Sequence, residues 1–358
     1  MENDGSPAPF AGTMDRGQFL RRAAAGGAAL AATSLLASSG KAQAQQMTDE
    51  TGAALPTGRQ FEIFYGDQSA TITEVGATLR SFTVAGQELL DTFAVDEMSD
   101  ASRGQVLLPF PNRVDGGLYQ FRGQENQLPL TEVAANNAIH GLTRWLDWIP
   151  LSWTTSRVEM VQRVYPQDGY PYVLALQIAY ELSSLGLSVV TTATNVGADT
   201  LPFGAGHHPY LTVGTPTINA ATLKLPAATY LQTNDRLIPT GSASVEGTDF
   251  DFREAREIGD VQLDTCFTDV MPDADGYSRV VMTHPAGSPE ITVWMDGEHG
   301  FIQAYTGDTL PEEDQRKGIA IEPMTCAPDA FNSGDGLRVL TPGESFTSVW
   351  GIACALRA

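Results

Sequence analysis

The sequence predicts an all-β fold, a large and mostly antiparallel β-sandwich. Several segments alternate apolar and polar residues with a period of two, and others are crowded with β-branched residues; both patterns are typical of strands. The 35 glycines and 21 prolines divide the 358-residue chain at the short intervals that many short strands require. Sustained helical periodicity is scarce, and the chain has no βαβ alternation, no GxGxxG motif and no P-loop.

The strand signal is clearest in four segments. Residues 174–182 and 291–295 alternate apolar side chains with polar or small ones, and residues 346–356 do the same near the C-terminus. Residues 187–194 are rich in Val and Thr. We expect a strand in each of these places.

The predicted strands belong to one large domain. No Pro- or Ser-rich linker divides residues 61–358, and no repeat of fixed period is visible in them. Helical turns are expected only in short stretches such as residues 251–257 and 311–316. Residues 45–60 are polar and small, and we expect them to form a flexible leader before the domain.

The N-terminal 44 residues have the three-part layout of an export signal. A basic region with arginines between residues 16 and 22 precedes an apolar, Ala-rich run at residues 23–37, and Ala-Gln-Ala at residues 42–44 offers a cleavage site. The basic region resembles a twin-arginine motif with a glycine in place of the second arginine, so the export route stays open. We expect residues 1–44 to be removed and the mature protein to be periplasmic or extracellular. No later segment approaches the length of a membrane span, so no stable membrane insertion is expected.

Charge and cysteine content narrow the range of functions. A formal net charge of −22 at pH 7 argues against nucleic acid and anionic membrane surfaces as partners and leaves a neutral small molecule open. The three cysteines, Cys266, Cys326 and Cys354, show neither a metal-ligand spacing nor a disulfide framework. A single disulfide between two of them remains open for an exported protein.

Glu322 is the leading catalytic candidate. It follows an apolar, strand-like run and precedes Pro323, which places one carboxylate at the mouth of a strand within rigid backbone. Partial burial would raise the pKa of this carboxyl from about 4.3 toward neutral pH, so that it could act as a general base. A glutamate before a proline is more often a solvated strand end, and only its companions elsewhere in the chain favour the catalytic role.

Two turns present polar side chains that could contact a ligand. A Pro-punctuated turn presents Asn112 and Arg113, and the planar donors of an arginine suit sugar hydroxyls or a carboxylate. A clamp on the turn would be an equally good use of this arginine. His140 precedes a glycine that would let a ligand approach the backbone, although a packed histidine is the commoner outcome.

The remaining candidates are His207, His208 and Asp264. Adjacent histidines on an extended strand point to opposite faces, so only one of this pair can face a given pocket. No Asp, Glu or Cys spacing accompanies them, so no metal site is predicted. Asp264 lies between apolar neighbours and needs a donor close by, unless it has the commoner role of forming a turn.

These candidates lie in short segments with a specific order and spacing. The segments are Gly-Ala-Thr-Leu-Arg-Ser-Phe at 76–82, Pro-Asn-Arg-Val at 111–114, Asn-Ala-Ile-His-Gly-Leu at 137–142, His-Pro-Tyr-Leu at 208–211, Ile-Pro-Thr-Gly at 238–241, Gly-Thr-Asp-Phe-Asp-Phe-Arg at 247–253, Gln-Ala-Tyr-Thr at 303–306, Glu-Pro at 322–323 and Pro-Asp-Ala-Phe-Asn at 328–332. Together they resemble the aldose 1-epimerase (galactose mutarotase) family over nearly all of residues 61–358. The departures, Leu211 in place of Phe and Asp249 in place of Pro, remove no catalytic group.

The resemblance implies a galactose mutarotase-like β-supersandwich without a metal or organic cofactor. It also implies the interconversion of the α and β anomers of a free aldohexose such as glucose or galactose. Carried over position by position, it makes Glu322 the general base and His208 the general acid, and it assigns no role to His207. The residues that it implies for substrate binding are Asn112, Arg113, His140, Asp264 and Tyr305.

Two other functions compete with a mutarotase. A non-catalytic sugar-binding protein would not need a matched acid and base. A glycoside hydrolase would use Asp264 and Glu322 as its two carboxylates, and the histidines fit that role less well. The low density of Lys and Arg near the candidates argues against a phosphorylated sugar. Phe110, Trp145 or Tyr305 could pack under the sugar ring, and the preferred aldose and the oligomeric state stay open.

Overall fold

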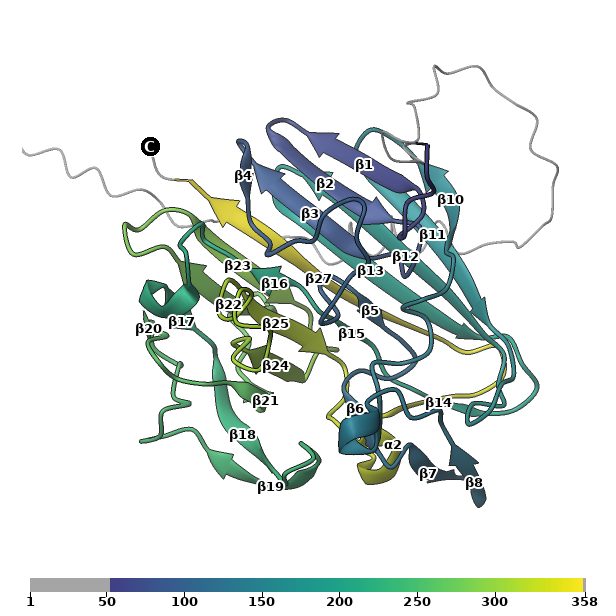
Figure 1. Ribbon diagram of the computed structural model, residues 1–358. Helices are drawn as coiled ribbons and strands as arrows, with labels where there is room; N and C mark the ends of the chain where they lie inside the picture. The colour runs from purple at the N-terminus through teal and green to yellow at the C-terminus, as the bar shows by residue number, and fades with distance from the viewer. Residues whose placement is uncertain (1–51, 357–358) are drawn as a thin grey trace, which may run out of the picture.

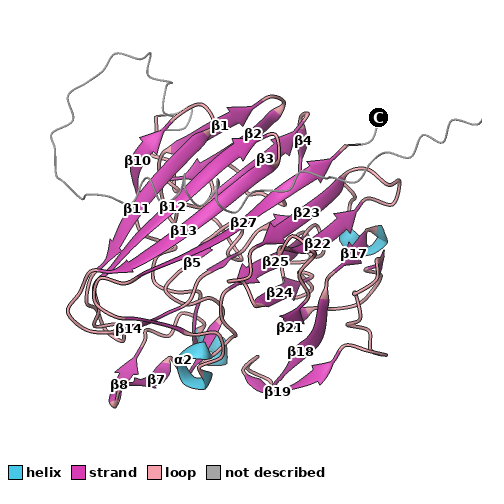
Figure 2. Ribbon diagram, turned by 180° about the vertical axis from the view of Figure 1, so that it is seen from behind, coloured by secondary structure: helices cyan, strands magenta, loops and turns pink. Residues whose placement is uncertain are grey.

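The computed structural model of the protein describes residues 52–356, and these residues form the predicted all-β fold. Two large antiparallel sheets make the two layers of a sandwich, and the same layers are visible from the front in Figure 1 and from behind in Figure 2. A smaller four-stranded sheet lies against the first layer, where Tyr180 donates a hydrogen bond to the carbonyl of Ala77 and Gln68 donates one to the carbonyl of Ser183.

The first layer is a nine-stranded sheet. Its strands run in the order β10 (Ile149–Trp153), β11 (Arg157–Val164), β12 (Leu174–Ser183), β13 (Gly186–Asn195), β27 (Ser345–Ala355), β23 (Glu290–Met295), β22 (Ser278–Thr283), β17 (Thr222–Lys224) and β20 (Arg256–Glu257). Strands β12, β13, β23 and β27 match the four predicted segments to within one residue at each end, so these predictions are confirmed.

The second layer is an eight-stranded sheet, and it carries Asp264, Tyr305 and Glu322. Its strands run in the order β19 (Pro239–Ser244), β18 (Ala227–Thr233), β21 (Asp264–Val270), β24 (Phe301–Tyr305), β25 (Ile319–Met324), β15 (Gly206–His207) and β5 (Val106–Leu107), with β16 (Tyr210–Leu211) also paired to β25.

Shorter elements surround the two layers. The four-stranded sheet contains β1 (Gln60–Tyr65), β2 (Gln68–Thr73), β3 (Leu79–Val84) and β4 (Gln87–Glu88). Three two-stranded ribbons pair β6 (Arg113–Asp115) with β9 (Asn137–Ile139), β7 (Leu118–Phe121) with β8 (Gln124–Gln127), and β14 (Leu201–Phe203) with β26 (Arg338–Leu340). Helices within the described residues are limited to the single turns η1 (Val133–Ala135), η2 (Ile218–Ala220) and α2 (Ala330–Ser333).

Neither of the two stretches that could hold a helical turn forms a helix. Residues 251–257 contain no helix, because the Asp251 side chain accepts hydrogen bonds from the backbone and side chain of Arg253, and such local bonds compete with a helix. Residues 311–316 form hydrogen-bonded turns only, and Arg316 ends them in a left-handed conformation with φ of 58°.

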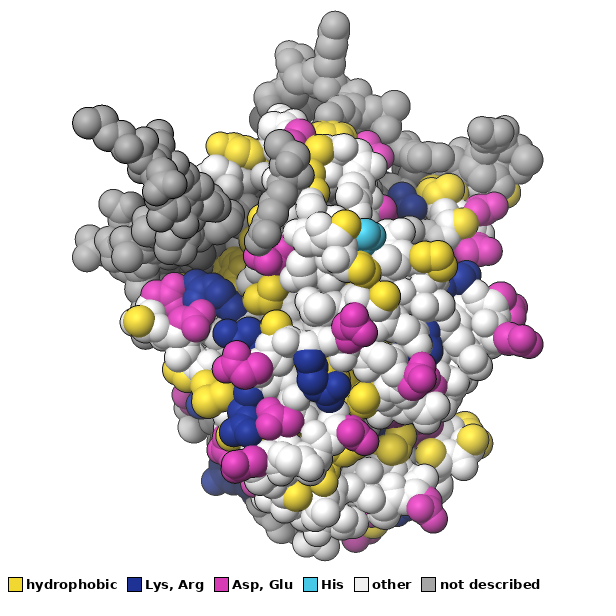
Figure 3. Space-filling view, turned by 90° about the vertical axis from the view of Figure 1, so that its left-hand side faces the viewer, with side chains coloured by type: hydrophobic (Ala, Val, Ile, Leu, Met, Phe, Trp, Pro, Cys, Tyr) yellow, Lys and Arg dark blue, Asp and Glu magenta, His cyan; other side chains and the backbone are white. Residues whose placement is uncertain are grey.

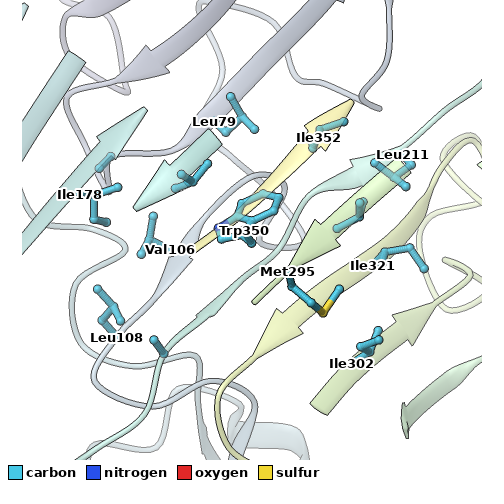
Figure 4. Close-up of a cluster of buried hydrophobic side chains, with 14 of the residues drawn as sticks. Leu79, Val106, Leu108, Ile178, Leu211, Met295, Ile302, Ile321, Trp350 and Ile352 are labelled. Carbon is cyan, nitrogen blue, oxygen red and sulfur yellow. The ribbon is translucent and has the colours of Figure 1, made fainter. Parts of the chain in front are cut away.

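The core between the two layers explains why the site lies on the outer face of the second layer. Figure 4 shows Ile302 and Ile321 among the buried apolar side chains, together with Trp350 from β27 of the first layer. Side chains alternate along a strand, so the next residues, Gln303 and Glu322, point to the opposite face.

The packed chain begins inside the stretch that the sequence suggested as a leader. Leu55 and Thr57 are buried, and β1 begins at Gln60. The predicted export signal at residues 1–44 lies outside the described residues. None of the helices within residues 52–356 is long and apolar enough to cross a membrane.

The surface and the cysteines complete the fold. Asp and Glu side chains are spread over the face shown in Figure 3, where they stand among Lys and Arg. All three cysteines lie in the described part of the chain and are free thiols; Cys266 and Cys326 are buried, and Cys354 is half-buried. The disulfide that the sequence left open is therefore not formed.

Candidate active site

Three neighbouring strands of the eight-stranded sheet form the floor of the site. Their register places Asp264 of β21 beside Tyr305 of β24, and Gln303 of β24 beside Glu322 of β25. Residues paired across antiparallel strands point to the same face. All four side chains therefore share the outer face of the sheet, where Gln303 Nε2 donates a 2.6 Å hydrogen bond to Asp264 Oδ1.

His208 reaches this face directly after β15. Its neighbour His207 points the other way: Nε2 of His207 lies 2.9 Å from Thr191 Oγ1, and its ring packs on Trp350 in the core. The expectation that only one of the two histidines can face the pocket is thus confirmed, and His208 is the one that does.

Glu322 and His208 form a close, buried pair. Nε2 of His208 lies 3.3 Å from Oε1 of Glu322, and the two side chains are 6% and 2% exposed, respectively. Burial, with a smaller contribution from the charge of Asp264, raises the pKa of Glu322 well above its usual range. Burial also lowers the pKa of His208 from 6.5 to about 3. Both pKa shifts favour the neutral forms, which are protonated Glu322 and uncharged His208. The pair therefore shares one transferable proton, which can pass between the carboxylate and the imidazole.

Arg113 is held in place at the edge of the floor by Glu132. Its Nε lies 2.9 Å from Oε2 of Glu132 and its Nη2 lies 2.9 Å from Oε1, a two-pronged contact that fixes the guanidinium plane. Nη2 also lies 3.9 Å from Oδ2 of Asp264. Burial raises the pKa of Asp264, and the positive charge of Arg113 opposes this shift.

His140 is fixed as a neutral donor. The N–H of Asn112 donates a 3.2 Å hydrogen bond to Nδ1 of His140, so the ring proton sits on Nε2, which is free to donate. Burial lowers the pKa of His140 well below its usual value. The residue after His140 is Gly141, with φ of 73°. It lets the chain pass close to Leu108, because a Cβ at this position would lie 2.1 Å from the carbonyl oxygen of Leu108. The rings of His140 and His208 meet edge to face, with centroids 5.2 Å apart.

These side chains line one cavity of about 270 Å³. It contains all seven residues predicted from the sequence, namely Asn112, Arg113, His140, His208, Asp264, Tyr305 and Glu322. The lining also includes residues that the sequence analysis did not single out, among them Ser102, Glu132, Arg144, Tyr210 and Gln303. A wider, open depression of about 1040 Å³, bordered by Asp115 and Asp329, contains none of the seven. Within residues 52–356, no group of three or more His, Cys, Asp or Glu side chains is placed to hold a metal ion.

Comparisons with known proteins identify the family. The sequence model of the aldose 1-epimerase family matches residues 62–353. The uncharacterized protein YihR of Escherichia coli K12 is 35% identical over 299 residues, which cover 82% of this chain and 94% of that protein. Human galactose mutarotase is 30% identical over 266 residues, or 68% of this chain and 76% of that enzyme.

The chain belongs to the aldose 1-epimerase family.

Solved structures of this family share the fold. An aldose epimerase homologue from C. elegans superposes with a TM-score of 0.75 at 20% identity, covering 84% of this chain and 99% of the other. A putative aldose 1-epimerase from Escherichia coli K12 gives a TM-score of 0.72 at 21% identity, covering 83% and 99% of the two chains. The galactose mutarotase-like sandwich expected from the sequence is therefore confirmed.

Two of the three aromatic side chains that could pack under the sugar ring do not line the cavity. Phe110 is buried and packs against Phe331, away from the cavity lining, because it belongs to the apolar core. Trp145 is 51% exposed and also lies outside the lining. Of the three aromatic candidates, Tyr305 alone borders the cavity.

Positive charge near the site was underestimated from the sequence. Arg113 and Arg144 both line the cavity, although few Lys and Arg lie close to the candidates along the chain. A signal for Arg144 was available, since it follows His140 by four residues, and Gln303 lies in the Gln-Ala-Tyr-Thr segment. Glu132 carries no sequence signal, because only folding brings it to Arg113.

Proposed function

We propose that the protein is an aldose 1-epimerase that interconverts the α and β anomers of a free aldohexose. The observation that carries this proposal is the 3.3 Å separation between Nε2 of His208 and Oε1 of Glu322. Mutarotation needs a base at the C1 hydroxyl and an acid at the ring oxygen, and both of these oxygens are bonded to C1. A base and an acid for this reaction must therefore end close together, as these two groups do.

In the proposed mechanism, the carboxylate of Glu322 removes the proton of the C1 hydroxyl while protonated His208 gives its proton to the ring oxygen. The bond between C1 and the ring oxygen breaks, and C1 becomes the carbonyl carbon of the open-chain aldehyde. Rotation about the C1–C2 bond presents the other face of the carbonyl. The two proton transfers then run in reverse, so the pair returns to its starting state with the other anomer formed.

The remaining side chains bind and orient the sugar in this proposal. Arg113 and Nε2 of His140 donate hydrogen bonds to sugar oxygens and stabilise negative charge that develops on oxygen. Asp264, held by Gln303, accepts hydrogen bonds from hydroxyls. Asn112 positions His140 through its backbone N–H, and Tyr305 forms one wall.

Polarimetry tests the proposal directly. The purified protein is added to freshly dissolved α-anomers of several free aldoses, and the rate at which optical rotation reaches equilibrium is compared with the spontaneous rate. We expect acceleration that is proportional to protein concentration. Failure to accelerate any free aldose would refute the epimerase, and release of reducing sugar from aryl glycosides would favour a hydrolase instead.

We also propose that the protein works outside the cytoplasm, on the basis of the signal-like N-terminal segment. A fusion of residues 1–60 to a reporter that is active only after export should give signal. Replacement of Arg21 and Arg22 by Gln should abolish it, and export that survived this change would contradict the role of the basic region.

A further inference from the structure

Arg144 is a cation of the cavity without an ionic partner. It lines the cavity and is half-buried, yet no carboxylate within residues 52–356 pairs with it. Its Nη1 donates to Ser102 Oγ at 3.1 Å, and its Nη2 donates to the carbonyl of Ile139 at 3.3 Å. By contrast, Arg113 in the same cavity is neutralised by Glu132. The guanidinium of Arg144 also lies over the ring of Trp145, 5.4 Å from its centroid. These contacts hold the guanidinium in place, and none of them supplies a negative charge.

An unpaired cation is unexpected in this protein. The chain has 43 acidic residues against 21 Lys and Arg, so carboxylates are abundant. Burial also costs an unpaired guanidinium part of its hydration, and it lowers the pKa of Arg144. A half-buried arginine whose neighbours fix its geometry but include no carboxylate is suited to an anionic group on a ligand.

The loop that carries Ser102 is tightly packed and has an unusual backbone conformation. Ala101 and Ser102 both adopt left-handed backbone with φ of 44° and 62°, a costly conformation for residues other than glycine. Gly104 packs so tightly that a Cβ there would lie 2.0 Å from the carbonyl oxygen of Leu79. Because the Ser102 oxygen accepts from Arg144, its own hydroxyl hydrogen is directed elsewhere and supplies a second donor.

Arg144 lies on the histidine side of the cavity. It binds the carbonyl of Ile139, the residue before His140, and its charge acts on the pKa values of His140 and His208. The groups that act on the pKa of Glu322 are Asp264 and Arg113. Under the proposed function, on which this inference rests, Glu322 meets the C1 hydroxyl and His208 meets the ring oxygen. Carbon C5 is bonded to that oxygen and carries C6, so a substituent on C6 extends toward the histidine side.

We propose that Arg144 and Ser102 bind an anionic group on C6 of the sugar, so that the preferred substrate is an acidic hexose rather than glucose or galactose. One unpaired guanidinium matches one negative charge, which points to a carboxylate or a sulfonate and not to a phosphate dianion. The cavity of about 270 Å³ is at the small end for ligand sites and suits a single monosaccharide.

Exchange NMR between the anomeric protons at equilibrium measures this preference. The sugars are D-glucose, D-glucuronate, D-glucose with a sulfonate on C6, and glucose 6-phosphate. We expect kcat/KM for at least one of the two singly charged acids to exceed that for glucose by about 10- to 100-fold, the range for a charge-assisted contact. This advantage should shrink as ionic strength rises, whereas the rate with glucose should not change.

Variants at Arg144 separate ligand binding from a structural role. Arg144→Gln should lower the ratio of kcat/KM for the acid to that for glucose by about 10- to 100-fold. Arg144→Lys should restore part of the ratio, because it returns the positive charge without the planar N–H donors of the guanidinium. The matched control is Arg163→Gln on the exposed face of β11, which makes the same charge change and should leave the ratio unchanged. If Arg144→Gln fails to fold, Ser102→Ala tests the same contact and should lower the ratio severalfold.

The outcomes distinguish this inference from the proposed function. Acceleration of none of the four sugars would refute the epimerase itself. Glucose turnover equal to or faster than that of both singly charged acids would overturn the inference alone. A ratio unchanged in Arg144→Gln, or the fastest turnover with glucose 6-phosphate, would also overturn it.

Discussion

Glu322 is stable as a neutral acid but is needed as a carboxylate. It is 98% shielded by the surrounding protein, and within residues 52–356 its Oε2 has no hydrogen-bond partner. Water would solvate a carboxylate far better than this site does, so the folded protein holds the ionised form at a cost. The same burial supplies a strong base once a sugar hydroxyl reaches it. Activity and stability should therefore move in opposite directions at this residue.

Replacement of the carboxyl by an amide tests the catalytic half of this argument. Glu322→Gln keeps the shape but cannot accept the C1 proton, so we expect kcat to fall by about 10²- to 10⁴-fold. Polarimetry or exchange NMR with the best substrate measures the loss. Glu125→Gln on the exposed ribbon strand β8 is the matched control and should keep full activity. Near-normal kcat in Glu322→Gln would remove this residue from the role of base.

The contribution of Glu322 to folding stability depends on pH, and the raised pKa fixes the direction of that dependence. Because the pKa of Glu322 is raised in the folded state, the folded protein holds this proton more tightly than the unfolded chain. Its contribution to stability is present at low pH and is lost as pH rises from about 4.5 through the raised pKa. Glu322→Gln should therefore raise the Tm by a few degrees at pH 8 and by less at pH 5. An equal or larger gain at pH 5 would contradict the raised pKa.

The two-residue period of a strand separates catalysis from packing at adjacent positions. His207 bonds Thr191 and packs on Trp350 in the core, whereas His208 faces Glu322 in the cavity. The same substitution at the two positions should thus affect different properties, since only one of the rings meets the substrate.

Histidine-to-glutamine variants at the two positions check this separation. His208→Gln should lower kcat by about 10²- to 10⁴-fold, because it removes the proposed acid. His207→Gln should keep kcat and lower the free energy of unfolding by about 1–3 kcal/mol, because a buried contact is lost. Each variant is the control for the other, with turnover and urea unfolding measured on both. A comparable loss of kcat in both would show that the strand does not separate the two functions.

Period-two patterns were readable from the sequence, and pairings between distant segments were not. The alternation at residues 174–182 predicted β12, and the adjacency of two histidines predicted their opposite orientation. The clamp of Glu132 on Arg113 and the bond from Gln303 to Asp264 depend on which strands become neighbours. Local periodicity in the sequence does not show which strands become neighbours. Asp264 illustrates the limit: its apolar neighbours suggested burial or a turn, and the register with β24 decides in favour of the cavity floor.

At the scale of the whole molecule, the site exists only when the entire sandwich is folded. Asn112 and His140 directly flank the ribbon of β6 and β9, while Asp264 and Glu322 come from strands of the second layer. Many parts of the domain together bury these polar side chains. Their titration should therefore appear in global unfolding and not only in activity.

Three of the four buried histidines make the fold less stable in acid. Burial lowers the pKa values of His140, His207 and His208, so each stays neutral in the folded protein while the unfolded chain takes up a proton below about pH 6.5. Stability is complete above that pH and is lost as pH falls toward the lowered pKa values. The raised pKa of Glu322 opposes this by one proton and reduces the slope without reversing the contribution of the histidines.

His207→Gln measures one of these three protons without touching the proposed site. Removing one titrating histidine should flatten the dependence of the unfolding free energy on pH by about 1.4 kcal/mol per pH unit between pH 6 and 5, the value for a single proton. Urea unfolding at pH 5, 5.5, 6, 7 and 8 gives both slopes. Arg163→Gln should give the wild-type slope, since it leaves all the histidines in place. Parallel curves for wild type and His207→Gln would mean that the folded protein already accommodates the charged imidazole, and the burial of His207 between the two sheets would then not keep it neutral.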